Sequence, residues 1–240
     1  MGALMERLTS FSDLLELQQV DSLIDKLRVD RRTLPELAEL REAAGEAAAT
    51  ASAHSDVNDR LRVVERSTAR VEDELTMTEQ RVREQERRLF AGAMTAREAD
   101  HLRLEVRNLR TRVSTMEDEL LELLEERERL DAEEEGARET AAEASGVERR
   151  LAARVAELEA TIDGSLARYL QRRAEIAAYI DSVLVRKYVQ LRKRRGGVVV
   201  GEVDGRVCGA CHLQMSVAEY EEVASDRIPQ CIHCAAILCL

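Results

Sequence analysis

From Leu61 onward, apolar residues of this chain recur at spacings that alternate between three and four, and this repeat constrains the fold most. Such a heptad pattern gives a helix one apolar stripe and predicts that the stripe packs against a second helix in a coiled coil. Charged residues fill the positions between. The first seam is Leu61, Val64, Thr68, Val71, Leu75, Thr78, Val82, Gln85 and Leu89; the second is Leu102, Val106, Leu109, Val113, Met116, Leu120, Leu123, Arg127 and Leu130, continued less regularly from Leu151 to Ile180.

A short break separates the two seams. Gly92 can adopt a left-handed conformation, and Thr95 with Glu98 has the spacing of a capping box. We therefore expect one helix to end near Phe90 and another to begin near Thr95. Because the connection is short, the two helices are predicted to form an antiparallel hairpin with its tip near residues 90–95. A parallel homodimeric coiled coil is the alternative.

An additional helix is expected over Phe11–Arg32, with Thr33 and Pro35 ending it and starting the next. Only two prolines occur in the chain, and aromatic residues make up 2% of it, which argues against a Rossmann or barrel enzyme. The predicted fold class is mainly α: a long antiparallel helical hairpin over residues 1–180 and a small β zinc ribbon within residues 181–240.

Four cysteines form two CxxC pairs in the tail. Cys208 and Cys211 are separated by nineteen residues from Cys231 and Cys234. Two such pairs predict two knuckles that hold one tetrahedral Zn²⁺, and four thiolates leave no coordination position for substrate, so the site is structural. Alternating valines at residues 198–203, a turn at Asp204-Gly205, a capped helix from Ser216 and a closing strand at Ile237-Leu238 complete the predicted ribbon.

Other interpretations of these cysteines are weaker. The sequence from Cys208 to His212 also matches the CxxCH haem-attachment motif, but that leaves the second pair unexplained. A thioredoxin-like redox motif would need a βαβ setting. His212 or His233 could replace one thiolate, although four thiolates are already a complete set. Cys239 is left over, and we assign it no role.

Charge is divided unevenly along the sequence. Residues 1–180 contain 28 basic and 40 acidic residues, whereas the rest contains 8 and 7. A nucleic-acid contact is therefore expected in the tail, with Tyr188 as a possible stacking group. The alternative is that these cations only complement a helix dipole. The candidate nucleic-acid-binding residues are Arg186, Lys187, Tyr188, Arg192, Lys193, Arg194 and Arg195.

The chain resembles the bacterial C4-type zinc-ribbon, coiled-coil family, long catalogued as a domain of unknown function. The resemblance rests on Leu14–Asp21 with Ile24-Asp25, on Glu117–Leu123, on Tyr188 with Leu191-Arg192 and Gly196-Gly197, on Cys208–Leu213 and on Cys231–Leu238. It implies a helical hairpin with a ribbon. Flagellated members look like adaptors that bind an alternative sigma factor and a flagellin transcript.

Two positions depart from that family pattern. Ala91-Gly92 and Ala96-Arg97 stand where many members have Ser-Gly and Asn-Pro around the tip, and Cys234 is followed by Ala235-Ala236 instead of Gly-Arg. The second departure removes an arginine, and any contact made through it, but leaves the four cysteines intact.

These features predict a non-enzymatic, cytoplasmic adaptor or regulatory protein. The ribbon and the basic helix end would bind RNA, DNA or a protein of the transcription or translation apparatus, and the coiled coil would act as spacer and second interaction surface. The alternatives are an RNA polymerase secondary-channel factor and a purely structural scaffold. We expect a monomer or weak homodimer, no small-molecule substrate and no membrane contact, since no apolar run approaches the roughly 18 residues of a membrane span.

Overall fold

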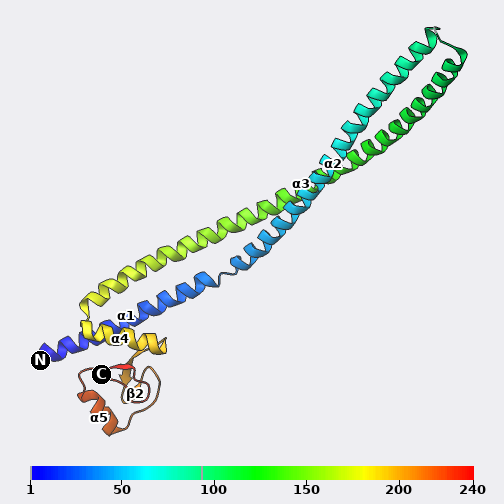
Figure 1. The fold of residues 1–240 in the computed structure, drawn as a ribbon. Coiled ribbons are helices and arrows are strands. Elements are labelled where there is room, and N and C mark those ends of the chain that lie inside the picture. Colours follow the sequence, from blue (N-terminus) through cyan, green and yellow to red (C-terminus); the bar gives the residue numbers. More distant parts are fainter. Residues whose placement is uncertain (1, 93) are drawn as a thin grey trace. The chain divides into compact units, whose positions relative to one another are not determined.

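The computed structural model describes residues 2–92 and 94–240, which form two compact units, Ala38–Ala152 and the chain up to Leu37 together with Ala153–Leu240. The mainly α fold is confirmed, as Figure 1 shows. Within the described residues no helix has the length and apolar character of a membrane span. The long helices are α1 (Gly2–Arg32), α2 (Glu36–Phe90), α3 (Ala96–Tyr179) and α4 (Ser182–Arg195).

The unit Ala38–Ala152 is an antiparallel hairpin of α2 and α3, and the predicted seams face each other. Val71 and Val82 on α2 and Met116 and Leu130 on α3 are all buried. Side chains bridge the helices in antiparallel order, from Gln85 with Glu105 near the tip to His54 with Glu134 farther along. The alternating spacing of three and four was therefore sufficient to identify the buried face.

Local sequence ends and restarts the helices where expected. Gly92 has a φ of 69°, a left-handed conformation in which a side chain would be strained. The Thr95 backbone N–H and Oγ1 both donate to the Glu98 carboxylate over 2.8 Å, and the Glu98 N–H donates back to Thr95 Oγ1 at 3.4 Å. These bonds complete the predicted capping box and start α3 at the next residue.

The other unit has one core to which α1, the end of α3, α4 and the ribbon all contribute. Leu17 and Ile24 of α1 pack with Ile176, Tyr188 and Val200 in a single buried cluster. The boundary placed after residue 180, between the helical hairpin and the part that contains the ribbon, follows the change in sequence pattern and stays a prediction. The physical consequence of the shared core is that α1, although far away in sequence, helps to hold the ribbon.

The ribbon consists of β1 (Val200–Asp204), β2 (Val207–Cys208), α5 (Val217–Ser225) and β3 (Ile237–Cys239). The sheet order is β2-β1-β3, with β1 antiparallel to β2 and parallel to β3. Ser216 caps α5 with both bonds of the predicted capping box. Gly209 is required because its backbone lies against β1: a Cβ there would approach the Glu202 carbonyl oxygen to 2.5 Å.

Candidate metal centre and basic helix

The four predicted cysteine ligands meet in the ribbon. The Sγ atoms of Cys208, Cys211, Cys231 and Cys234 all lie within 4.8 Å of one another. The Cys208–Cys234 and Cys211–Cys231 sulfur pairs are each 3.8 Å apart, too far for a disulfide bond. A tetrahedron of sulfurs at about 2.3 Å from a central ion has edges of roughly 3.8 Å. The cluster therefore has the dimensions of one tetrahedral metal site.

The two knuckles are built in the same way. The N–H of His212 donates to the Cys208 carbonyl, and the N–H of Ala235 donates to the Cys231 carbonyl, both over 2.7 Å. Both donor residues are left-handed, with φ of 61° at His212 and 56° at Ala235. An alanine in this conformation costs roughly 1–2 kcal/mol. Alanine in place of glycine at position 235 therefore strains the second knuckle, whose two cysteines still lie in the four-sulfur cluster.

Burial and hydrogen bonding shift the pKa values of several ribbon thiols. Burial raises the pKa of the Cys208 thiol to about 12, while backbone N–H groups, including that of Ala210, act in the opposite direction. Burial raises the pKa of Cys231 as well, whereas at Cys234 burial is outweighed by hydrogen bonds, including one from the Ala236 N–H, that lower the pKa. A cation that replaces these protons supplies the charge that the buried thiolates need. With four sulfurs around it, the ion would have no open position for a substrate.

The remaining histidine and cysteine candidates lie outside this site. His212 and His233 are exposed, and neither belongs to the four-residue cluster. The Cys239 thiol donates to the Phe11 carbonyl of α1 over 3.3 Å, and burial raises its pKa to about 12. This cysteine is thus a packing residue between β3 and α1.

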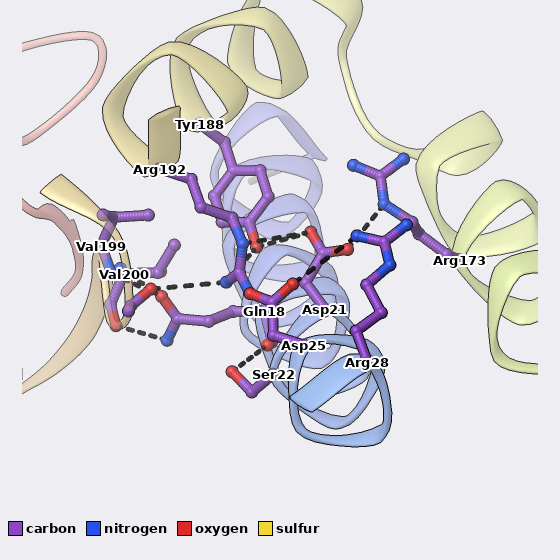
Figure 2. Close-up of polar contacts among 11 residues, drawn as sticks. Gln18, Asp21, Ser22, Asp25, Arg28, Arg173, Tyr188, Arg192, Val199 and Val200 are labelled. Carbon is purple, nitrogen blue, oxygen red and sulfur yellow. Dashed lines mark hydrogen bonds and ion pairs between the residues drawn. The ribbon is translucent and has the colours of Figure 1, made fainter. Parts of the chain in front are cut away.

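The predicted nucleic-acid residues on α4 divide into two groups, and Arg192 belongs to the internal one. Its guanidinium contacts the Asp25 carboxylate over 2.5 Å and the Tyr188 hydroxyl over 3.3 Å. It also donates to the Gly197 carbonyl that follows the helix. Figure 2 shows Arg192 between α1 and the start of β1. The side chain is 15% exposed, so its main contacts are within the protein.

Tyr188 does not have the accessibility that a stacking group needs. The residue is fully buried, and its hydroxyl donates to the Asp21 carboxylate over 2.8 Å. Burial and the neighbouring Asp21 raise the pKa of the phenol well above its ordinary value. The suggestion that Tyr188 stacks on a base is therefore wrong for this fold, because the ring packs in the core.

The exposed group comprises the other predicted cations. Arg186, Lys193 and Arg194 are exposed and Lys187 is partly exposed, and within the described residues none of them forms an ion pair. The guanidinium of Arg195 donates to the carbonyl of Cys234. The basic end of α4 is thus attached directly to the second knuckle of the metal site.

Two polar residues of α1 join this helix to α3, to α4 and to the start of β1, and they were not predicted as site residues. Gln18 Oε1 accepts from the N–H groups of Val199 and Val200 over 2.6 and 2.8 Å, and its Nε2 donates to the Val200 carbonyl. Asp21 accepts from Tyr188 and from Arg173 of α3. Figure 2 shows these contacts converging on one face of α1. The sequence does contain a signal that could have identified Gln18 and Asp21, because both are polar residues within the apolar stripe of this helix.

The carboxylates near the hairpin tip are committed to local contacts. Glu98 accepts both bonds of its capping box, and Asp100 accepts from Arg103 over 2.8 Å.

Comparison with known proteins gives matches over most of the chain. The sequence profile of the "CT398-like coiled coil hairpin domain" matches residues 17–196. The uncharacterized protein Rv2229c of Mycobacterium tuberculosis is 28% identical over 242 residues, which cover 94% of this chain and 93% of the relative.

Two solved structures share the fold. A protein from Mycobacterium smegmatis aligns over 96% of this chain and 97% of its own, with a TM-score of 0.79 and 24% identity. CT398 from Chlamydia trachomatis aligns over 99% of both chains, with a TM-score of 0.52 and 19% identity. At these identities the likeness concerns the fold alone.

Proposed function

The chain belongs to the family of CT398-like coiled coil hairpin domains, and from this premise we propose that it is a non-enzymatic adaptor whose head binds RNA. The head comprises the ribbon and α4. The proposed ion in the ribbon is a single structural Zn²⁺, which prefers four thiolates in this arrangement. The proposed location is the cytoplasm, where reducing conditions keep the cysteines free to bind metal.

The observation that carries this proposal is the group of exposed cations on α4. The helix has six cations and no carboxylate in its 14 residues. Arg192 is engaged by α1, whereas Arg186, Lys187, Lys193 and Arg194 face solvent with no acidic partner among the described residues. Such a surface suits a polyanion, because each phosphate that it neutralises releases a condensed counterion.

The burial of Tyr188 limits what kind of RNA binding is proposed. With that ring in the core, α4 offers charge without an aromatic platform. Contacts to phosphates carry no sequence information directly. The proposed binding is therefore driven by phosphates and tolerant of sequence, with selectivity left to a protein partner of the adaptor.

The contacts at the hairpin tip favour an adaptor over a polymerase secondary-channel factor. Such a factor needs tip carboxylates that can hold Mg²⁺. Glu98 instead accepts from Thr95, the residue just before α3, and Asp100 accepts from Arg103 within α3. The four sulfurs support a structural ion, because together they fill its coordination shell and leave no position for a substrate or water.

The test is a fluorescence-anisotropy titration of labelled, unstructured RNA at several salt concentrations. With four cations on phosphates, the slope of log K against log salt concentration should be about −3. The test variant replaces Arg186, Lys187, Lys193 and Arg194 with alanine; the control variant, with the same loss of charge, replaces the exposed Arg41, Arg66, Arg70 and Arg81 of α2.

The expected result is that the α4 variant loses most of its affinity and its salt dependence while the α2 variant binds like the original chain. Equal binding by both variants would overturn the role of α4, and an undetectable interaction of the original chain with RNA would remove RNA as the ligand. DNA of the same length tests whether the 2′-hydroxyl contributes.

A further inference from the structure

The outer face of α3, turned away from α2, carries a second heptad pattern, which we call the outer seam. It consists of positions 97, 104, 111, 118 and 125 together with positions 100, 107, 114, 121 and 128. These are the b and f positions of the heptad whose a and d positions, among them Val106 and Leu102, are buried, so the outer seam is centred roughly 150° around the helix from the buried seam. All ten residues are exposed, including Leu104 at 53% and Leu121 at 60%.

The charge of α3 changes sign at the middle of the outer seam. Residues 97–112 contain five arginines and three carboxylates, whereas residues 117–128 contain one arginine and seven carboxylates. At the midpoint stand two small residues, Thr111 and Ser114, in a shallow hollow that Arg107 also lines. Small side chains there allow another helix to approach closely.

Five charged residues of the outer seam lack an ion-pair partner in the part of the chain that the structure describes. They are Arg97 and Arg107 on the basic half and Asp118, Glu125 and Glu128 on the acidic half. Hence the two halves carry opposite charges that the hairpin itself does not neutralise.

We propose that the outer seam binds the outer seam of a second copy of this chain, with the two α3 helices antiparallel and related by a two-fold axis near residues 112–113. In this register the residue numbers of facing positions add up to 225. Leu104 then faces Leu121, Arg107 faces Asp118 and Arg97 faces Glu128, and symmetry makes each pair twice. At the centre Thr111 faces Ser114 of the second copy, in the same way as an a residue faces a d residue of the partner helix in an antiparallel coiled coil.

Charge complementarity selects this occupant. A parallel second copy would place arginine against arginine and carboxylate against carboxylate. RNA would suit the basic half but would be repelled by the seven carboxylates that follow within about 20 Å. One like-charge pair arises in the proposed register, Asp100 with Glu125, and Arg103 already neutralises Asp100 at a distance of 2.8 Å.

The first experiment is sedimentation velocity of the full chain at about 50 mM and about 500 mM salt, which brackets weak and strong screening of surface charge. The expected result is a dimer at high protein concentration and low salt that dissociates at high salt. Arg107→Glu should raise the dimer dissociation constant at least about tenfold, since it places like charges together twice. Asp118→Arg should do the same, and the double variant should restore the dimer.

A matched control tests whether the effect is specific to the outer seam. Arg70→Glu and Glu72→Arg change equally exposed residues of α2 and should leave the dissociation constant unchanged. A chain that remains monomeric at low salt would overturn the proposal, and so would a dimer that is insensitive to Arg107→Glu.

Disulfide cross-linking tests the register directly. Leu104→Cys and Leu121→Cys, each alone, should not cross-link under mild oxidation, because identical positions are about 25 Å apart in the antiparallel register. A mixture of the two single variants should give a covalent heterodimer, with the original chain as background for its own cysteines. Cross-linking of either variant with itself would overturn the antiparallel arrangement.

Discussion

Replacing Gln18 with leucine tests whether α1 is a structural part of the head. Three buried hydrogen bonds join this side chain to Val199 and Val200, at 2.6, 2.8 and 2.9 Å. Leucine fills a similar volume but leaves two N–H groups and one carbonyl without partners. At about 1–3 kcal/mol for each of these three buried unpaired groups, the opening free energy of the start of β1 should fall by roughly 3–9 kcal/mol.

Hydrogen exchange followed by mass spectrometry measures this loss in the full chain. Peptides covering residues 198–204 should exchange at least about a hundredfold faster in Gln18→Leu, because every 1.4 kcal/mol is a factor of ten. Peptides from α2 and the first half of α3 should not change. Gln18→Glu should lie between, since a carboxylate still accepts from both N–H groups but faces the Val200 carbonyl with an oxygen.

Gln19 supplies the matched control, because it is exposed on the same helix. Gln19→Leu should leave the exchange of residues 198–204 unchanged. If Gln18→Leu stayed within about threefold of the original rate, the interaction of α1 with the ribbon would have to be energetically unimportant, and the argument from buried polar groups would fail.

Three further predictions address the ribbon, the head and the hairpin. Ala235→Gly should relieve the left-handed strain at φ 56° and tighten metal binding by about fivefold, or roughly 1 kcal/mol, in competition with a chelator; weaker binding would refute the strain. Tyr188→Phe should cost about 1–3 kcal/mol near neutral pH, because Asp21 loses a buried donor. The pKa of this phenol is raised in the folded protein above its unfolded value of 10.0, so the stability that Tyr188 contributes is full below about pH 10 and decreases above that pH. Urea titrations should show this alkaline loss of stability in the original chain and a smaller loss in Tyr188→Phe. Thr78→Val should stabilise the hairpin by about 1 kcal/mol, because among the described residues the Thr78 hydroxyl bonds only the Glu74 carbonyl of its own helix. Circular dichroism should show this as a higher melting temperature, and a lower one would contradict it.

Features encoded by neighbouring residues were predicted well from the sequence. The seams, the Thr95–Glu98 and Ser216–Glu219 capping boxes and the paired cysteines all depend on residues within a few positions of one another or on a fixed spacing. Such signals reflect helix periodicity and local hydrogen bonding, which act before any long-range contact forms.

The contacts that define the head could not be derived in the same way. Gln18 and Val200 are 182 positions apart, and Asp21 and Tyr188 are 167 apart. Tyr188 lies among cations in the sequence, yet the helix turns its ring inward and its neighbours outward. Only the direction in which α4 packs on α1 distinguishes a buried phenol from an exposed one.

The most direct test of the account is the metal content and coordination of the full chain, purified without added metal. The account predicts one Zn²⁺ per chain, with X-ray absorption giving four sulfur neighbours at about 2.3 Å and no nitrogen neighbour. Substoichiometric metal, with all four ribbon cysteines alkylated equally fast before and after chelation, would contradict it.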